Sequence, residues 1–146
     1  MGWIGKPIKR VDALDKVTGR ALYPGDINMP NQVYAKVLFA KTPHARVVSV
    51  NVDPALSLPG VLAVFTAKDV PVNGYGLNNM DQPVLCGPGS VKPYTDRVRF
   101  IGDQVALIVA ETEEIAAQAR DFIVVEYENY QSHRSDERDC TTASSR

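Results

Sequence analysis

Few side chains in this 146-residue chain have the types and the spacing that metal binding needs. His44 follows a proline in a predicted turn, and His133 lies close to the C-terminal end. A site with two histidines would need a third ligand in a fixed geometry, and the sequence offers none nearby. Cys86 and Cys140 are far apart and form no Cys-x-x-Cys pair, which argues against a zinc site and a disulfide framework. We therefore predict no metal-binding residue.

Two further patterns are typical of catalytic sites, but each has a simpler structural explanation. Residues 86–90 (Cys-Gly-Pro-Gly-Ser) are slightly similar to a phosphate-binding loop, yet they lack its lysine and its strand-to-helix setting. Glu113 and Glu114 suit the first turn of a helix, and Glu126 and Glu128 suit a strand that leaves the core. No Ser or Cys has a basic partner recognisable from spacing. The sequence therefore predicts no catalytic and no cofactor-binding residue, with a small enzyme of unrecognised site as an alternative.

Composition argues against several classes of partner. The net charge is −1 and the charges are mixed along the chain, so no cluster of Lys and Arg is present to displace counterions from nucleic acid or from an anionic membrane. No apolar run approaches the roughly 18 residues of a membrane span, and the N-terminus lacks the pattern of a secretory signal. We expect a cytoplasmic protein that binds neither nucleic acid nor membrane.

The best-defined part of the chain lies between residues 97 and 128. Thr112 is placed to cap the N-terminus of a helix. The period of the apolar residues predicts, in order, a strand, a hairpin turn at Gly102-Asp103, a buried strand over 105–110, a helix over 113–122 and a strand over 123–127. The apolar residues expected to form one buried stripe on the helix are Ile115, Ala116, Ala119 and Phe122.

Alternating apolar residues predict the earlier elements. Two strands, over 33–40 and 46–52, are expected to pair as an antiparallel hairpin. The inward-facing residues of the second are expected to be Val48, Val50 and Val52. A helix is predicted over about 54–58, with a proline in its first turn. The remaining predicted elements are a short strand over 20–23, a strand over 61–66 and a helical turn over 67–70.

Two segments have no periodicity. Residues 71–96 are rich in glycine and proline, and two interpretations stay open: an ordered surface excursion held by Val84 and Leu85, or a segment that orders against a partner domain. Residues 132–146 contain no aromatic residue and no aliphatic one larger than alanine, so we expect a disordered polar tail. The folded domain is therefore predicted to span residues 1–131.

Three stretches, in this order, resemble one protein family. The first is Arg10-Val-Asp12 with residues 16–26, the second runs from Thr42 to Pro71, and the third from Val98 to Glu128. Over about residues 4–128 they are similar to the N-terminal region of the molybdenum-binding large subunit of the xanthine dehydrogenase/aldehyde oxidoreductase family. The resemblance implies an α/β-hammerhead domain, an α+β fold of mixed or antiparallel strands with two helices, at about 54–58 and 113–122.

The same resemblance implies an oxidoreductase that hydroxylates purines, other N-heterocycles or aldehydes. Molybdopterin-bound molybdenum is implied for the full subunit, with 2Fe-2S clusters and FAD in partner subunits or domains. The family's pterin-binding loops and catalytic glutamate lie in larger domains that follow the hammerhead, so no such residue is assigned here. After Glu128 the chain departs from the family pattern, and residues 132–146 resemble read-through in another frame or an engineered end.

We therefore expect a structural domain that is inert alone and packs against the remaining molybdenum-binding domains of the same subunit. The iron–sulfur and FAD subunits, and a second copy of the chain, are its other expected partners. The alternative hypothesis is a stand-alone binding module that uses the loop 71–96 to capture a ligand.

Overall fold

The computed structural model describes residues 4–130, and these fall into two units, residues 4–32 and 33–130. The predicted tail at 132–146 lies outside the described residues. The first unit contains one short helix, α1 (Ala13–Val17), and a 3-10 turn, η1 (Pro24–Asp26). Before α1, the Asp12 carboxylate forms ion pairs with Lys16 and Arg10, and these cations lower its pKa. No residue of α1 is buried.

The strand predicted over residues 20–23 is wrong, and α1 was not predicted. The backbone amides of Arg20 and Ala21 both donate to the carbonyl of Asp15, at 2.8 and 3.0 Å. These two amides therefore belong to the turn that closes α1 and are not available to a strand partner. Gly19, at φ +71°, allows the chain to reverse there.

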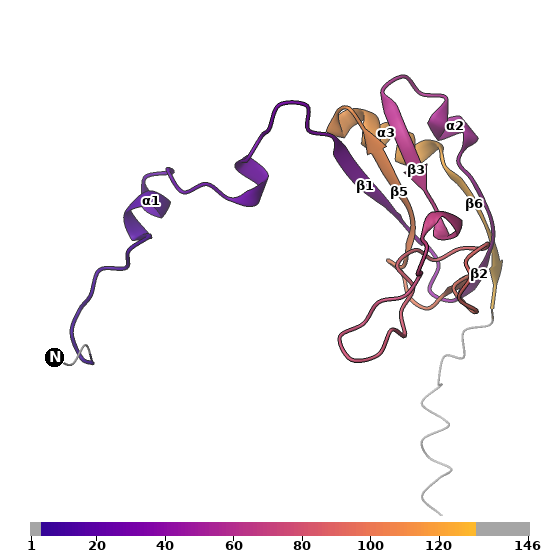
Figure 1. Ribbon diagram of the computed structural model, residues 1–146, viewed down its shortest axis with the longest axis horizontal. Helices are drawn as coiled ribbons and strands as arrows, with labels where there is room; N and C mark the ends of the chain where they lie inside the picture. The colour runs from indigo at the N-terminus through magenta and orange to yellow at the C-terminus, as the bar shows by residue number, and fades with distance from the viewer. Residues whose placement is uncertain (1–3, 131–146) are drawn as a thin grey trace, which may run out of the picture. The chain divides into compact units, whose positions relative to one another are not determined.

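The second unit contains two antiparallel three-stranded sheets (Figure 1). We call the sheet with strand order β1-β5-β3 the first sheet and the sheet with order β4-β2-β6 the second sheet. The strands of the first sheet are β1 (Tyr34–Phe39), β5 (Gln104–Ala110) and β3 (Val61–Phe65). Those of the second are β4 (Arg97–Val98), β2 (Ala45–Asn51) and β6 (Val124–Asn129). The predicted α+β fold is confirmed.

Two helices cover one face of the first sheet. Helix α3 (Glu113–Phe122) packs on β1 and β5, and helix α2 (Asp53–Leu56) packs on α3 and β3. Both predicted helices are present: α3 has the predicted bounds, whereas the helix predicted over about 54–58 spans only Asp53–Leu56. The cap of α3 is also as predicted, because the Thr112 hydroxyl accepts a hydrogen bond from the backbone amide of Ile115 at 3.2 Å. The predicted helical turn after β3 is the 3-10 turn η2 (Ala67–Asp69).

The predicted hairpin between β1 and β2 is wrong. Strand β1 pairs with β5, and β2 pairs with β4 and β6, so the two neighbours in sequence lie in different sheets. At the end of β1, Ala40 donates to the carbonyl of Asp103 and accepts from the amide of Gly102. Ala40 therefore stays with β5, and the chain crosses to the second sheet before Ala45. For the same reason Gly102-Asp103 is a turn between the two sheets and not a hairpin turn.

Local irregularities change which side chains are buried. A register shift between Val47 and Ser49 leaves Val47 1% exposed and Val48 51% exposed, so the inward position predicted for Val48 is wrong. On α3 the predicted stripe is correct at Ala116 and Ala119, which are fully buried. Phe122 instead faces outward, and its neighbour Ile123 enters the core.

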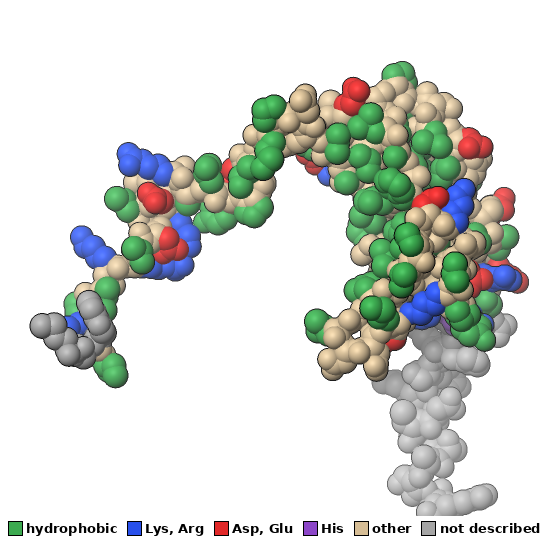
Figure 2. Space-filling model, in the orientation of Figure 1, with side chains coloured by type: hydrophobic (Ala, Val, Ile, Leu, Met, Phe, Trp, Pro, Cys, Tyr) green, Lys and Arg blue, Asp and Glu red, His purple; other side chains and the backbone are tan. Residues whose placement is uncertain are grey.

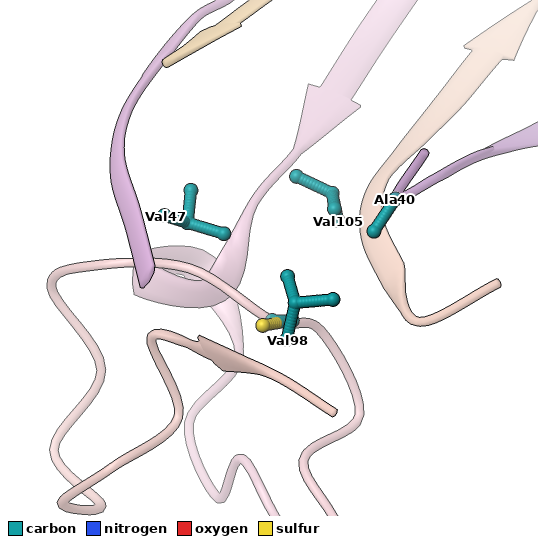
Figure 3. Close-up of a cluster of buried hydrophobic side chains, with 5 residues drawn as sticks. Ala40, Val47, Val98 and Val105 are labelled. Atoms are coloured by element: carbon teal, nitrogen blue, oxygen red, sulfur yellow. The ribbon is translucent and has the colours of Figure 1, made fainter. Parts of the chain in front are cut away.

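The core consists of two clusters that share the partly buried residues Val50 and Val125. One lies between the first sheet and its helices and includes Ala106, Ile108 and Ala119. The other, drawn in Figure 3, is made by Ala40, Val47, Cys86, Val98 and Val105. Strand β5 contributes Val105 to one cluster and Ala106 and Ile108 to the other, which explains the apolar residues at these three positions.

Candidate functional site

The loop between η2 and β4 is fixed by one buried amide side chain. Asn73 is 2% exposed; its Nδ2 donates to the carbonyl of Leu85 at 2.7 Å, and its Oδ1 accepts from the amides of Val84 and Leu85 at 2.8 and 2.9 Å. A single bridge between Tyr75 and Gln82 closes the loop tip. These contacts agree with the interpretation of an ordered surface excursion. The sequence pattern indicated Val84 and Leu85 but not Asn73, because nothing local reveals partners eleven and twelve residues away.

Cys86 is a structural thiol. It lies in the core cluster of Figure 3, and burial, together with the nearby Asp103 carboxylate, raises the pKa of its thiol to about 12. A neutral thiol is neither a nucleophile nor a good metal ligand. The following Gly87 amide donates to the carbonyl of Thr95 at 2.9 Å, so it is not free to bind a phosphate. The structure thus places Cys86 and Gly87 in the core packing, whereas Pro88 and Gly89 are exposed.

The remaining candidate residues are spread over the unit. The ring of His44 packs on Tyr130, with centroids 5.0 Å apart, whereas His133 lies outside the described residues. Glu113 forms an ion pair with Lys36 at 2.5 Å, and this cation lowers the Glu113 pKa. Glu126 accepts a hydrogen bond from the Ser49 hydroxyl. Within residues 4–130, no three His, Cys, Asp or Glu side chains are grouped so that they could hold a metal ion.

Two concavities involve the free edges and loops of the second unit. A groove of about 710 Å³ runs between β1, the end of α3 and β6, and Arg120 and Asp121 at its rim are paired with each other at 3.0 Å. A smaller cavity of about 310 Å³ lies between the loop 71–96 and the turn before β5. Its charged residues are Asp81, Arg99 and Asp103, and the Asp103 carboxylate accepts from the backbone amide of Arg99 at 2.9 Å. Neither cavity combines a nucleophile with a base.

Across the described part of the chain, we find no helix with the length and apolar character needed to cross a lipid bilayer.

Comparison with known proteins assigns the fold to one family. The family model described as "Aldehyde oxidase and xanthine dehydrogenase, a/b hammerhead domain" matches residues 18–131. A probable xanthine dehydrogenase subunit of Bacillus subtilis is 44% identical over 137 residues, which cover 92% of this chain and 17% of the relative. The "Nicotinate dehydrogenase large molybdopterin subunit" of Eubacterium barkeri is 36% identical over 126 residues, covering 86% of this chain and 28% of that protein.

Solved structures give the same result. Quinoline 2-oxidoreductase from Pseudomonas putida 86 superposes with a TM-score of 0.74 at 30% identity, over 88% of this chain and 16% of that chain. The aldehyde oxidoreductase of Desulfovibrio desulfuricans has a TM-score of 0.74 at 28% identity, over 90% of this chain and 15% of its own. The chain thus spans between about one seventh and just over one quarter of the length of these relatives. It belongs to the aldehyde oxidase and xanthine dehydrogenase family, and residues 18–131 are the α/β-hammerhead domain of that family.

Proposed function

We propose that this chain is the structural hammerhead domain of a molybdopterin-dependent hydroxylase and that it has no catalytic activity by itself. The chain matches only 17% of the Bacillus subtilis relative, so most of such a protein lies in other domains. In this proposal the chain packs against those domains, and the assembled subunit oxidises an N-heterocycle or an aldehyde. The iron–sulfur and FAD components belong to partner subunits or domains, and the location is cytoplasmic.

The described residues do not fit a molybdenum–pterin group. The thiol of Cys86 is buried among apolar side chains and has a pKa of about 12, so it does not offer a thiolate to a metal. One carboxylate of each neighbouring pair already has a partner. Glu113 forms an ion pair with Lys36, and Glu126 accepts a hydrogen bond from the Ser49 hydroxyl. We therefore assign no reaction step to these residues and place the cofactor in the remaining domains.

Taken by itself, the first unit leaves its apolar side chains uncovered, and this observation supports packing most directly. Residues 4–32 form turns and ion pairs, yet none of them is buried. Exposed apolar surface on this scale is typical of regions that are covered in an assembly. The apolar side chains in this unit that are at least half exposed are Ile4, Ile8, Val11, Leu14, Val17, Leu22, Tyr23, Ile27 and Met29.

A chimeric subunit tests this proposal. The matched region of the Bacillus subtilis relative is replaced by this chain's residues 1–131, and the chimera is expressed with the partner subunits of that enzyme. We expect it to bind molybdenum and to oxidise the substrates of the parent enzyme at a rate within about tenfold of the parent. A chimera that folds but contains no molybdenum would contradict the proposed role.

The alternative of a stand-alone binding module predicts a different result. A ligand that is held by the loop 71–96 would protect that loop from proteolysis. We expect the loop of the 146-residue chain to be cut at the same rate with and without cell lysate. Selective protection by lysate, combined with an inactive chimera, would favour the binding module instead.

A further inference from the structure

We propose that the face of the first sheet opposite α2 and α3, here called the outer face, is the surface that docks on the remaining molybdenum-binding domains of the same subunit. This inference rests on the proposed function and specifies the surface involved. It also assigns one anchoring position, an apolar notch between β1, β3 and β5 that receives a side chain of the docked domain.

The strand register defines the outer face. Val37, Leu107 and Phe65 lie side by side across β1, β5 and β3, and Ala35, Val109 and Ala63 form the next row. Successive side chains of a strand point to opposite faces, so the residues between these rows point toward the helices. That assignment agrees with the core, because the residues of the opposite face that pack with α3 include Leu38, Ala106, Ile108 and Val64.

The outer face departs from the pattern of a sheet with one face in water, because it is as apolar as the face that packs on the helices. Such a sheet alternates between apolar residues inside and polar residues outside. Here the charged residue of β1, Lys36, lies on the helix side, where its ammonium group reaches Glu113. Both rows of the outer face are entirely apolar, and the view in Figure 2 shows hydrophobic side chains gathered over β1, β5 and β3. Phe65 at this face is 41% exposed.

A notch of about 250 Å³ is set into this face. Its walls are mainly apolar and include Val37, Phe65, Pro71 and Leu107, with Val70, Val84 and Leu85 alongside. The one charged residue there, Asp69, is already engaged, since its Oδ2 accepts from the amide and the hydroxyl of Thr66 at 2.8 and 2.9 Å. The notch therefore suits an aliphatic or aromatic side chain, the kind of anchor that dominates the energy of buried interfaces.

The length of the relatives identifies the occupant as part of the same subunit. This chain covers 17% of the Bacillus subtilis relative and 16% of the quinoline oxidoreductase chain, so a hammerhead domain is joined to several times its own length of further protein. Neighbouring domains of one chain bury about 600–1,500 Å² between them, and permanent contacts are the more hydrophobic ones. An uncharged, apolar sheet face matches a permanent contact of that kind.

The test uses the chimeric subunit, with a photo-crosslinking amino acid, benzoylphenylalanine, in place of Phe65. After irradiation, mass spectrometry identifies the crosslinked peptide. We expect an adduct to a segment outside the hammerhead region of the same polypeptide. An adduct to a second copy of the chain, to a lipid or to no protein segment would overturn the docking surface. Molybdenum binding is measured separately in the unsubstituted chimera. A chimera without molybdenum would contradict the proposed function, whereas a chimera with molybdenum but without the expected adduct would contradict only this docking surface.

Matched substitutions give a second, independent measurement. The variant Phe65→Ser changes the outer face, where Phe65 is 41% exposed, and Phe122→Ser changes a phenylalanine of similar exposure elsewhere, 51%. In the chimera we expect the outer-face variant to lower molybdenum content at least tenfold, while the control stays near the unsubstituted chimera. In the 146-residue chain alone, both variants should have similar melting temperatures. Equal molybdenum contents for the two chimeric variants would overturn the proposal.

Discussion

At the scale of single residues, Asn73 and Cys86 show what the sequence could and could not predict. The cap formed by Thr112 was predictable, because a helix N-cap and its partner lie three residues apart. The partners of Asn73 lie eleven and twelve residues away across an irregular loop, and no local rule connects them. That Cys86 takes part in neither a metal site nor a disulfide stays a prediction. Cys86 is buried in a cluster that includes residues of β2, β4 and β5, and only the fold brings these strands together.

The first prediction concerns Asn73. Replacing it with Ala leaves the amides of Val84 and Leu85 and the carbonyl of Leu85 without their partner. Loss of a buried polar partner costs roughly 1–3 kcal/mol, so the free energy of unfolding in urea should fall by about that amount. Trypsin or thermolysin should also cut the loop 71–96 faster. The control is Asn78→Ala at an exposed position, which should change neither the free energy of unfolding nor the rate of proteolysis. If Asn73→Ala also changed neither quantity, the described contacts would be contradicted.

The second prediction concerns the thiol of Cys86. Its folded pKa of about 12 lies above the ordinary value of 9.0, so the folded chain keeps a proton that the unfolded chain releases. Its contribution to stability is present below pH 9 and is lost as the pH rises from 9 toward 12. In a Cys140→Ser variant at pH 8, iodoacetamide should modify the native thiol at least about tenfold more slowly than the thiol in denaturant. Equal rates would show that Cys86 is not buried.

At the scale of elements, the sequence predicted the strands and helices better than their pairing. The apolar run over 105–110 and the helix over 113–122 were identified from local periodicity, and both are present. The pairing of β1 with β5 instead of β2 was not predicted, because both candidate partners are apolar and the choice depends on contacts far apart in the sequence. The register shift in β2 places Val48 outward, and the alternation of apolar and polar residues does not predict such a shift.

Strand β5 provides the third prediction, since two adjacent residues lie on its opposite faces. Ile108 is fully buried against the helices, whereas Leu107 is only partly buried and lines the outer-face notch. Ile108→Ala should lower the free energy of unfolding of the 146-residue chain by about 2–5 kcal/mol, as expected for a buried cavity. Leu107→Ala should cost less in this chain, about 1–2 kcal/mol.

The same two substitutions, made in the chimeric subunit, test whether the outer face is buried there. There the cost of Leu107→Ala should rise toward that of Ile108→Ala, because docking buries the outer face. Thermal unfolding of both variants in both proteins measures this difference. A Leu107→Ala effect that is equally small in the chimera would show that the notch stays open to solvent.

At the scale of the whole molecule, the chain has a core of its own and yet leaves much apolar surface uncovered. Its two core clusters are built from residues of the second unit. Taken by itself, the first unit has no buried residue among those described. The outer face of the first sheet is apolar without a cover from α2 or α3. These properties support the proposal that this domain, which spans about one sixth of the Bacillus subtilis and Pseudomonas putida relatives, is stabilised further by other domains.

The central claim, that the cofactor belongs to the other domains and not to this chain, is tested most directly by metal analysis. The 146-residue chain and the chimeric protein are purified from the same molybdenum-supplied cells, and their molybdenum is measured by mass spectrometry. We predict close to one molybdenum per chimeric polypeptide and a background level in the 146-residue chain. Stoichiometric molybdenum bound to the 146-residue chain alone would contradict the account.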